Sequence, residues 1–307
     1  MQFKRDSMKK IIIGSLILFT VVTGFYGCRK NDNPKLPEGI ETGVFPKLTQ
    51  DPAGDELIQD VNSFSTAFTL DVFYPKPLPQ KMDVRVVMND DYTNVKTLKA
   101  DVTSFPTKIT VTGPQLAQLF GLTPDQVEID DQFTISPDIT LQSGKLLTAF
   151  AYGVNGTDTF NLAPYGGDAL NTPGANTILT YKKVCTLNID SLSNVKGGGA
   201  MILDDPDVLE SSYPVTLTKE NDSTIRINNY ATVPGAILKL KIIQKSQTIV
   251  IDKQAIAPSF PGYPYHNWVA KGTGTINACD NSMTLKVSFS VDEGAFDPVT
   301  QTIKRPE

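Results

Sequence analysis

The segment Phe260–Trp268 holds the side chains of this sequence that are best suited to contact a ligand. It contains phenylalanine, tyrosine and tryptophan, two prolines and the chain's only histidine, in the order FPGYPYHNW. Flat aromatic faces suit the apolar faces of sugar rings, and Tyr, His and Asn side chains supply hydrogen bonds around them. The candidate ligand-binding residues are therefore Tyr263, Tyr265, His266 and Trp268.

The same segment has a purely structural interpretation. Trp268 and one of the tyrosines would close the end of a β-barrel, and Pro261 and Pro264 would hold the turn. The sequence leaves both interpretations open, because a loop between strands is where scaffolds display binding groups but also where barrel ends are filled.

Other residue patterns give little support for catalysis, so the chain is expected not to be an enzyme. A single histidine removes most metal-binding and acid–base schemes. The acidic runs Asp130–Asp131 and Asp204–Asp207 lack the spacing of a calcium loop and are expected to be solvated loops. The glycine-rich stretch 163–176 lacks a phosphate-binding pattern, and no G-x-S-x-G elbow occurs. We expect no catalytic residues, no metal and no cofactor.

Composition narrows the class of partner. The 307 residues carry a net charge of -5, with 40% hydrophobic and 20% charged residues, as in a globular protein. The chain has no basic field to hold a phosphate backbone, so nucleic acid is not expected as a partner.

The N-terminal stretch Met8–Lys30 has the pattern of a secretion signal. Two lysines precede an apolar run of about a dozen residues, which is short of the ~20 that span a bilayer. Gly27 and then Cys28 follow, and here the chain resembles a bacterial lipoprotein, whose new N-terminal cysteine carries lipid. The alternatives are an ordinary cleaved signal or an uncleaved anchor. The resemblance implies an outer-membrane protein that is lipid-anchored through Cys28, with its domains on the periplasmic or the cell-surface face.

Four segments follow from these patterns. Residues 1–28 are the signal peptide and lipobox, and residues 29–38 are a polar tether with two prolines. Residues 39–184 contain short alternating strands and one brief helix, 114–121, which predicts a β-sandwich. The order of a strand, KITVTGPQLAQLFGL and a hairpin is similar to N-terminal immunoglobulin-like domains of starch-utilisation-type lipoproteins.

Residues 185–307 form successive predicted hairpins, including 268–277 with 283–291. Such a meander closes into a small barrel or a two-layer sheet. Cys185 and Cys279 are an even pair in an exported chain, which permits a disulfide but also two buried thiols.

The second region resembles a recurrent C-terminal β-meander of Bacteroidota cell-surface lipoproteins. The resemblance rests on 185–190 (CTLNID), 213–218 (YPVTLT), 272–275 (GTGT) with Cys279, and 291–294 (VDEG). Both cysteine positions recur in those proteins, which implies a Cys185–Cys279 bridge. We therefore expect an accessory binding component of the envelope that contacts the membrane through its lipid and binds a polysaccharide or an outer-membrane transporter complex. The alternative is a structural or adhesive surface protein with a protein partner.

Overall fold

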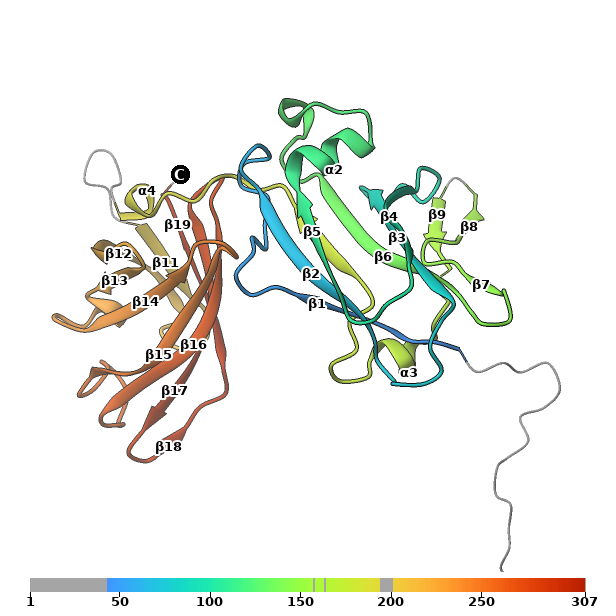
Figure 1. Ribbon diagram of the computed structural model, residues 1–307. Coiled ribbons are helices and arrows are strands. Elements are labelled where there is room, and N and C mark those ends of the chain that lie inside the picture. Colours follow the sequence, from blue (N-terminus) through green and yellow to red (C-terminus); the bar gives the residue numbers. More distant parts are fainter. Residues whose placement is uncertain (1–42, 157, 163, 194–200, 307) are drawn as a thin grey trace, which may run out of the picture. The chain divides into compact units, whose positions relative to one another are not determined.

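A computed structural model describes residues 43–156, 158–162, 164–193 and 201–306 (Figure 1). The compact unit of the fold runs from Val44 to Glu307. The predicted all-β class is confirmed, because the described helices are short: α2 (Gly113–Leu119), α3 (Gly167–Leu170) and α4 (Ile189–Ser193). The predicted signal, the predicted tether and Cys28 lie outside the described residues.

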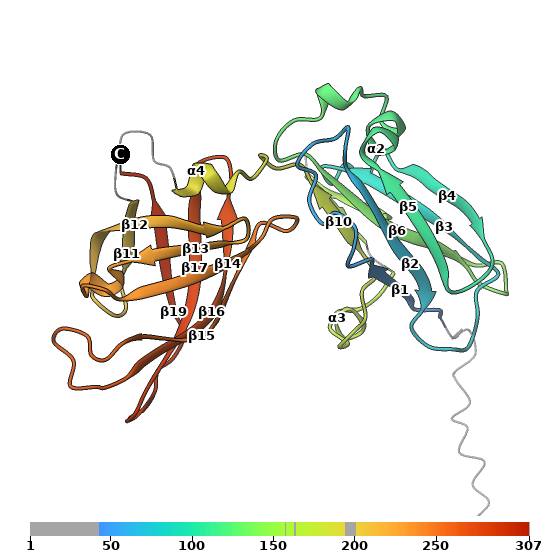
Figure 2. The same ribbon diagram turned by 60° about the vertical axis from the view of Figure 1, so that its left-hand side comes forward.

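The N-terminal part is a sandwich of two β-sheets, as predicted. One sheet has the order β1-β2-β5, and the other has the order β10-β6-β3-β4 with β7 added to β6 (Figure 2). Consecutive strands such as β2 and β3 lie in different sheets, as in an immunoglobulin fold. The strands are β1 (Pro46–Gln50), β2 (Ser65–Val72), β3 (Lys81–Met88), β4 (Lys96–Val102), β5 (Thr107–Thr112), β6 (Gln132–Thr140), β7 (Leu146–Leu147) and β10 (Leu179–Lys182).

Alternating apolar side chains build the sandwich core. Phe68 and Leu70 of β2 pack in one cluster with Val84 of β3 and Ile135 of β6, and all four are fully buried. Period-two burial of this kind fixes the register, since a slip by one residue would expose every one of these side chains.

The single predicted helix of the sandwich is α2. Thr112 caps it by accepting a hydrogen bond from the backbone N–H of Gln115 at 3.4 Å, and Pro114 stands in the first turn. Gly121 follows with a φ of +74°, a conformation that glycine adopts at low cost. Leu116 and Ala117 face the core, so the helix covers the sandwich after β5.

One expectation for this domain is wrong. The alternation across 146–152 predicts a single strand, but β7 ends at Leu147. Ala149 and Phe150 turn into a small separate cluster with Val87. The chain then forms a two-stranded hairpin of β8 (Tyr152–Asn155) and β9 (Asp158–Asn161).

The C-terminal part is a closed antiparallel barrel of 8 strands, which decides between the two predicted arrangements. Each strand pairs with the next, and β19 closes the ring between β17 and β11. Its strands, with the short β18, are β11 (Met201–Asp205), β12 (Ser211–Asn221), β13 (Thr224–Asn228), β14 (Ile237–Ile243), β15 (Thr248–Ala257), β16 (Trp268–Asn277), β17 (Ser282–Val291), β18 (Gly294–Ala295) and β19 (Val299–Lys304).

Two glycines allow β16 to lie close against β17. A Cβ on Gly272 would come within 2.2 Å of the Lys286 carbonyl oxygen, and one on Gly274 within 2.6 Å of the Thr284 carbonyl oxygen. Glycines at such points let a strand bend as the sheet closes into a barrel.

Replacing Gly272 with alanine is therefore expected to destabilise the barrel by about 1–3 kcal/mol, the usual cost of overpacking. Urea unfolding followed by far-ultraviolet circular dichroism measures the change. Gly166→Ala is the matched control, because a Cβ there meets nothing within 4 Å. Equal midpoints for Gly272→Ala and the wild type would contradict the close approach.

Candidate functional site

The loop between β15 and β16 closes one end of the barrel. The backbone N–H of Asn267 donates to the Pro258 carbonyl at 2.8 Å, which ties the end of the loop to its beginning. The backbone N–H of Asp292 donates to the His266 carbonyl at 3.0 Å, which ties the loop to the turn after β17. These bonds hold the predicted ligand-binding segment in a defined shape.

Trp268 does not lie on the surface, contrary to its expected role as a ligand contact. Its side chain is 1% exposed. Its indole ring stacks on Phe260 with the ring centroids 4.3 Å apart and on Phe296 at 5.2 Å. Because aromatic rings occupy both of these stacked positions, the indole has no free face for a sugar. The structural interpretation of Trp268, as part of the packing at the barrel end, is the correct one.

The two tyrosines of the loop are half-buried. The Tyr263 hydroxyl donates a hydrogen bond to the Val208 carbonyl, so its polar end is already occupied. Tyr265 packs edge-on against Phe296, with centroids 5.2 Å apart, and against Trp268. Tyr265 is therefore the loop aromatic that combines a supported position with a partly accessible ring.

His266 is exposed and paired with a carboxylate. Its Nδ1 lies 2.8 Å from Glu293 Oε1, and its backbone N–H donates to Glu293 Oε2 at 3.1 Å. The hydrogen bond with Glu293 raises the pKa of His266, and the same bond lowers the pKa of Glu293. In the described part of the chain no hydroxyl or thiol is hydrogen-bonded to this imidazole, so the pair fastens the loop instead of activating a nucleophile.

The His266 pair gives a pH prediction that one resonance can test. A histidine pKa that is raised in the folded protein stabilises the loop below the unfolded pKa of about 6.5, and this contribution disappears as pH rises through the folded pKa. Because the chain has one histidine, proton NMR should show a single titrating imidazole with a pKa above 6.5. Glu293→Gln should bring that pKa back toward 6.5. An unchanged His266 pKa in the Glu293→Gln variant would contradict the pairing of these two side chains.

A buried polar cluster lies inside the barrel, where sequence patterns predict a solvated acidic loop. That expectation is wrong for Asp205, which lies on β11 and is 1% exposed. Asp205 Oδ1 accepts a hydrogen bond from the Val208 N–H at 3.1 Å, and burial raises the pKa of its carboxyl group. Nearby, the Tyr230 hydroxyl donates to Gln301 Oε1 at 2.7 Å. These groups are too buried to meet a ligand and belong to the barrel interior.

A pocket opens on the outer face of the barrel beside the aromatic loop, with a volume of about 390 Å³. Phe296 connects the two features, since it stacks on Trp268 and also lines the pocket. Apolar and polar side chains both line it: Val269, Phe289, Ala295, Phe296 and Pro298, with Lys253, Lys271, Ser288 and Ser290. No carboxylate is among these lining residues.

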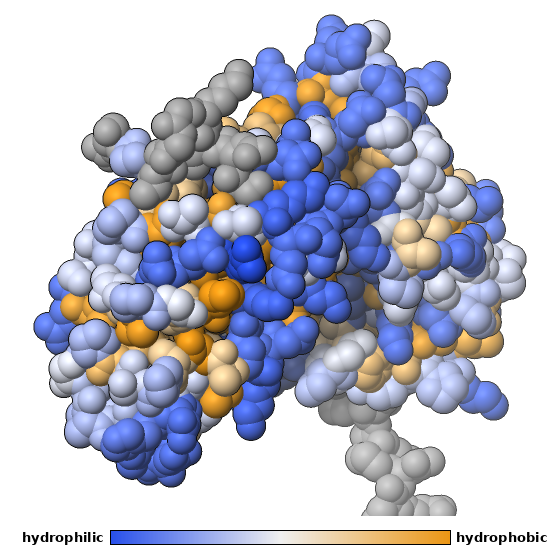
Figure 3. All heavy atoms as spheres, turned by 90° about the vertical axis from the view of Figure 1, so that its left-hand side faces the viewer, coloured by the Kyte–Doolittle hydropathy of each residue, from blue (hydrophilic) through white to orange (hydrophobic). Residues whose placement is uncertain are grey.

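A second groove, about 250 Å³, lies on the outer faces of β12–β15. Its charges neutralise one another: Lys239 Nζ is 2.9 Å from Glu220 Oε1, and Asp252 also lines the groove. A charged ligand would have to displace these internal partners, so the pocket at Phe296 is the stronger candidate. On the face drawn in Figure 3, the apolar patches are small and lie among hydrophilic residues. A local pocket is therefore a better candidate for a binding site on this face than a broad apolar surface.

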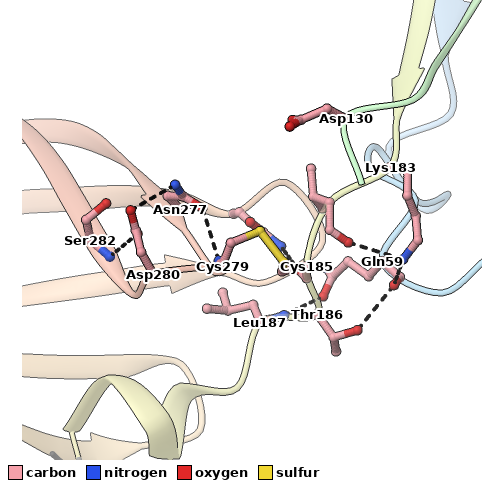
Figure 4. The surroundings of a disulfide bond; sticks show 12 residues. Gln59, Asp130, Lys183, Cys185, Thr186, Leu187, Asn277, Cys279, Asp280 and Ser282 are labelled. Carbon is pink, nitrogen blue, oxygen red and sulfur yellow. Dashed lines mark hydrogen bonds between the residues drawn. A yellow bond between two sulfur atoms is a disulfide. The ribbon is translucent and has the colours of Figure 1, made fainter. Parts of the chain in front are cut away.

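Cys185 and Cys279 form a disulfide, with their Cα atoms 5.1 Å apart (Figure 4). The distance lies within the range of about 4.4–6.8 Å that a bridge requires. Cys279 belongs to the turn between β16 and β17, and Cys185 lies on the segment that leads into the barrel. Gln59 holds this segment as well, because its Oε1 accepts a hydrogen bond from the Leu187 N–H at 3.0 Å.

Comparisons with known proteins found no matching family model and no matching curated protein. Within the described ranges, no His, Cys, Asp and Glu side chains gather in a group of three or more that would hold a metal ion. None of the described helices is long and apolar enough to cross a membrane.

Proposed function

We propose that this protein is a lipid-anchored accessory binding component of a Bacteroidota-type outer membrane, and that its barrel binds a carbohydrate. The lipid would be attached to Cys28, and the protein would work beside a nutrient-uptake transporter. The support for the location is the lipobox-like sequence at Gly27–Cys28. The support for binding is the pocket at Phe296 together with the partly accessible ring of Tyr265.

The composition of the pocket is the observation that carries the proposal. The apolar side chains of the lining suit the C–H faces of a sugar ring, and the hydroxyls of Ser288 and Ser290 suit its hydroxyl groups. Lys253 and Lys271 add two positive charges, in a protein whose net charge is -5. A glycan that carries carboxylates, such as one built from uronic acids, matches this arrangement of charges better than a neutral glycan.

A glycan array followed by titration calorimetry tests this function. We expect retention of acidic glycans, and we expect Lys253→Gln and Lys271→Gln each to weaken binding by about ten-fold, the usual effect of losing a charge-assisted hydrogen bond. The matched control is Lys286→Gln, which removes an exposed lysine of β17 that does not line the pocket. Failure of every glycan on the array to bind would end the proposal.

The anchor is tested separately. Metabolic labelling with palmitate should label the wild type in the membrane fraction and should not label Cys28→Ser. A labelled Cys28→Ser chain, or an unlabelled wild type, would contradict lipidation at this residue.

A structural or adhesive role with a protein partner is the second candidate. The β8–β9 hairpin favours it, because this hairpin and the residue after it expose large apolar side chains: Tyr152, Val154, Phe160 and Leu162. Exposed apolar side chains in a group are typical of protein contacts. Crosslinking in cells that is lost on Val154→Asp, with no glycan retained on the array, would favour this role.

A further inference from the structure

The end of the sandwich at which the described chain begins exposes an unusual set of side chains. Three large apolar residues there are half exposed: Tyr74 is 56%, Leu78 is 50% and Leu146 is 52% exposed. Two lysines, Lys76 and Lys145, stand between them in the sequence and are also exposed. We call these five residues the entry rim.

Strand directions bring the entry rim together. One loop joins the end of β2 to the start of β3, and another joins the end of β6 to the start of β7. The start of β3 pairs with the end of β6, so both loops lie at the same end of the sandwich. The Gln80 N–H donates to the Thr140 carbonyl at 2.8 Å, and the Gln142 side chain donates to the Leu78 carbonyl at 3.4 Å. The two loops are therefore in direct contact.

The start of the described chain lies at the same end. Strand β1 begins opposite the end of β2, with Pro46 paired to Val72. Phe73 contacts Phe45 with ring centroids 5.8 Å apart, and it contacts Tyr74 at 4.9 Å. A row of aromatic rings thus connects the first residues of the fold to the rim.

The lysines of the rim are available to an anionic partner. Neither Lys76 nor Lys145 has an ion-pair partner among the residues that the structure describes. The nearby Lys81, by contrast, is paired with Asp83 at 3.2 Å and with Asp101 at 2.6 Å. The carboxylates at this end of the sandwich are thus partly occupied, and the rim has two uncompensated cations.

We propose that the entry rim is a membrane-contact surface that lies against phospholipid headgroups. The inference rests on the proposed lipid anchor at Cys28. The fourteen residues between Cys28 and Gly43 (42 − 28 = 14) span at most about 50 Å when fully extended. The rim is therefore held within reach of the bilayer.

The chemistry of the rim fits this partner. Tyrosine is enriched at membrane interfaces, leucine side chains enter the boundary of the acyl chains, and lysines are attracted to anionic headgroups. A protein partner would not require the rim to lie at the end of the sandwich where the described chain begins, whereas a membrane that holds the lipid anchor would. The anchor would then hold the protein at the membrane, and the rim would set which end of the sandwich faces it.

Cosedimentation with vesicles tests the proposal without the anchor. The probe is the chain from residue 28 onward with Cys28→Ser, mixed with vesicles of equal parts phosphatidylethanolamine and phosphatidylglycerol. We expect it to bind, and we expect Lys76→Glu and Lys145→Glu each to weaken binding by roughly five-fold or more, from a contribution of about 1 kcal/mol per lysine. Leu78→Asp combined with Leu146→Asp should reduce binding to background.

Ile129→Asp is the matched control, because Ile129 is 44% exposed and precedes β6, at the opposite end of the sandwich. It should bind vesicles like the parent chain. Absence of vesicle binding by the parent, or an equal loss in Ile129→Asp, would overturn the proposal. The proposal would also be overturned if the chain bound no vesicles but self-associated in a concentration-dependent way that Leu78→Asp abolishes. The rim would then be a contact with a second copy of the chain. Palmitate labelling and glycan retention are read out separately, so a failure of the rim is distinct from a failure of the proposed function.

Discussion

Replacing Trp268 with alanine is expected to destabilise the barrel by about 3–5 kcal/mol, the usual cost of truncating a fully buried aromatic side chain. The indole stacks on Phe260 and Phe296 and also contacts Phe289, with centroids 5.8 Å apart. Its removal leaves a cavity where the loop, β17 and the segment after β18 meet. Urea unfolding followed by far-ultraviolet circular dichroism measures the loss, since Trp268 is the only tryptophan and its fluorescence is lost in the variant.

Two comparisons make this result specific. Trp268→Phe should lose much less stability than Trp268→Ala, because one ring can still fill part of the stack. Tyr265→Ala, at a half-buried position of the same loop, should also lose less. A Trp268→Ala protein that unfolds at the wild-type urea concentration but no longer binds glycan would contradict the structural assignment of Trp268.

Removing the disulfide should have a comparable effect on the barrel. Cys185 and Cys279 are separated by 94 residues, so the bridge closes a loop that contains most of the barrel strands. A cross-link over a loop of this length is expected to contribute about 4–5 kcal/mol by restricting the unfolded chain. Thermal unfolding of the Cys185→Ser, Cys279→Ser double variant should show a large decrease in the midpoint of the barrel.

Reduction of the wild type supplies the control for that prediction. With dithiothreitol the wild type should unfold like the double variant, whereas the double variant should be insensitive to the reductant. Equal thermal midpoints for the wild type and the double variant under oxidising conditions would contradict the prediction. The disulfide would then not contribute to the stability of the fold.

The strands that sequence patterns located are those with buried, alternating faces. Strand β16 (Trp268–Asn277) has the bounds predicted above, and the alternation in the sequence also marks strand β13 (Thr224–Asn228). Each lies between two neighbours in the barrel, so one face is buried along its length and the alternation in the sequence is clear.

Two of the strands that the sequence patterns do not predict, β4 and β11, lack such a signal. Strand β4, KTLKADV, is the last strand of its sheet, and most of its side chains are exposed. Strand β11 follows a glycine run and ends in two aspartates, the second of which is buried inside the barrel. Pairing with other strands, β3 in the first case and β12 and the distant β19 in the second, forms these elements.

The candidate site was predicted only in part. The aromatic loop is recognisable because its residues are contiguous, but whether Trp268 faces outward or inward depends on Phe296, which follows it by 28 positions (296 − 268 = 28). The pocket was missed, since its lining comes from β15, β16, β17 and the segment around β18. No local spacing of Lys253, Lys271 and Ser290 marks them as neighbours before the barrel has closed.

The proposal that the barrel pocket binds an acidic glycan is tested most directly by NMR shift mapping. An isotope-labelled chain would be titrated with the acidic glycan that the array retains most strongly. We predict amide shifts concentrated at Lys253, at Lys271, at Ser288–Ser290 and around Phe296. Shifts confined to the sandwich, or to the groove that contains Glu220 and Lys239, would contradict the account.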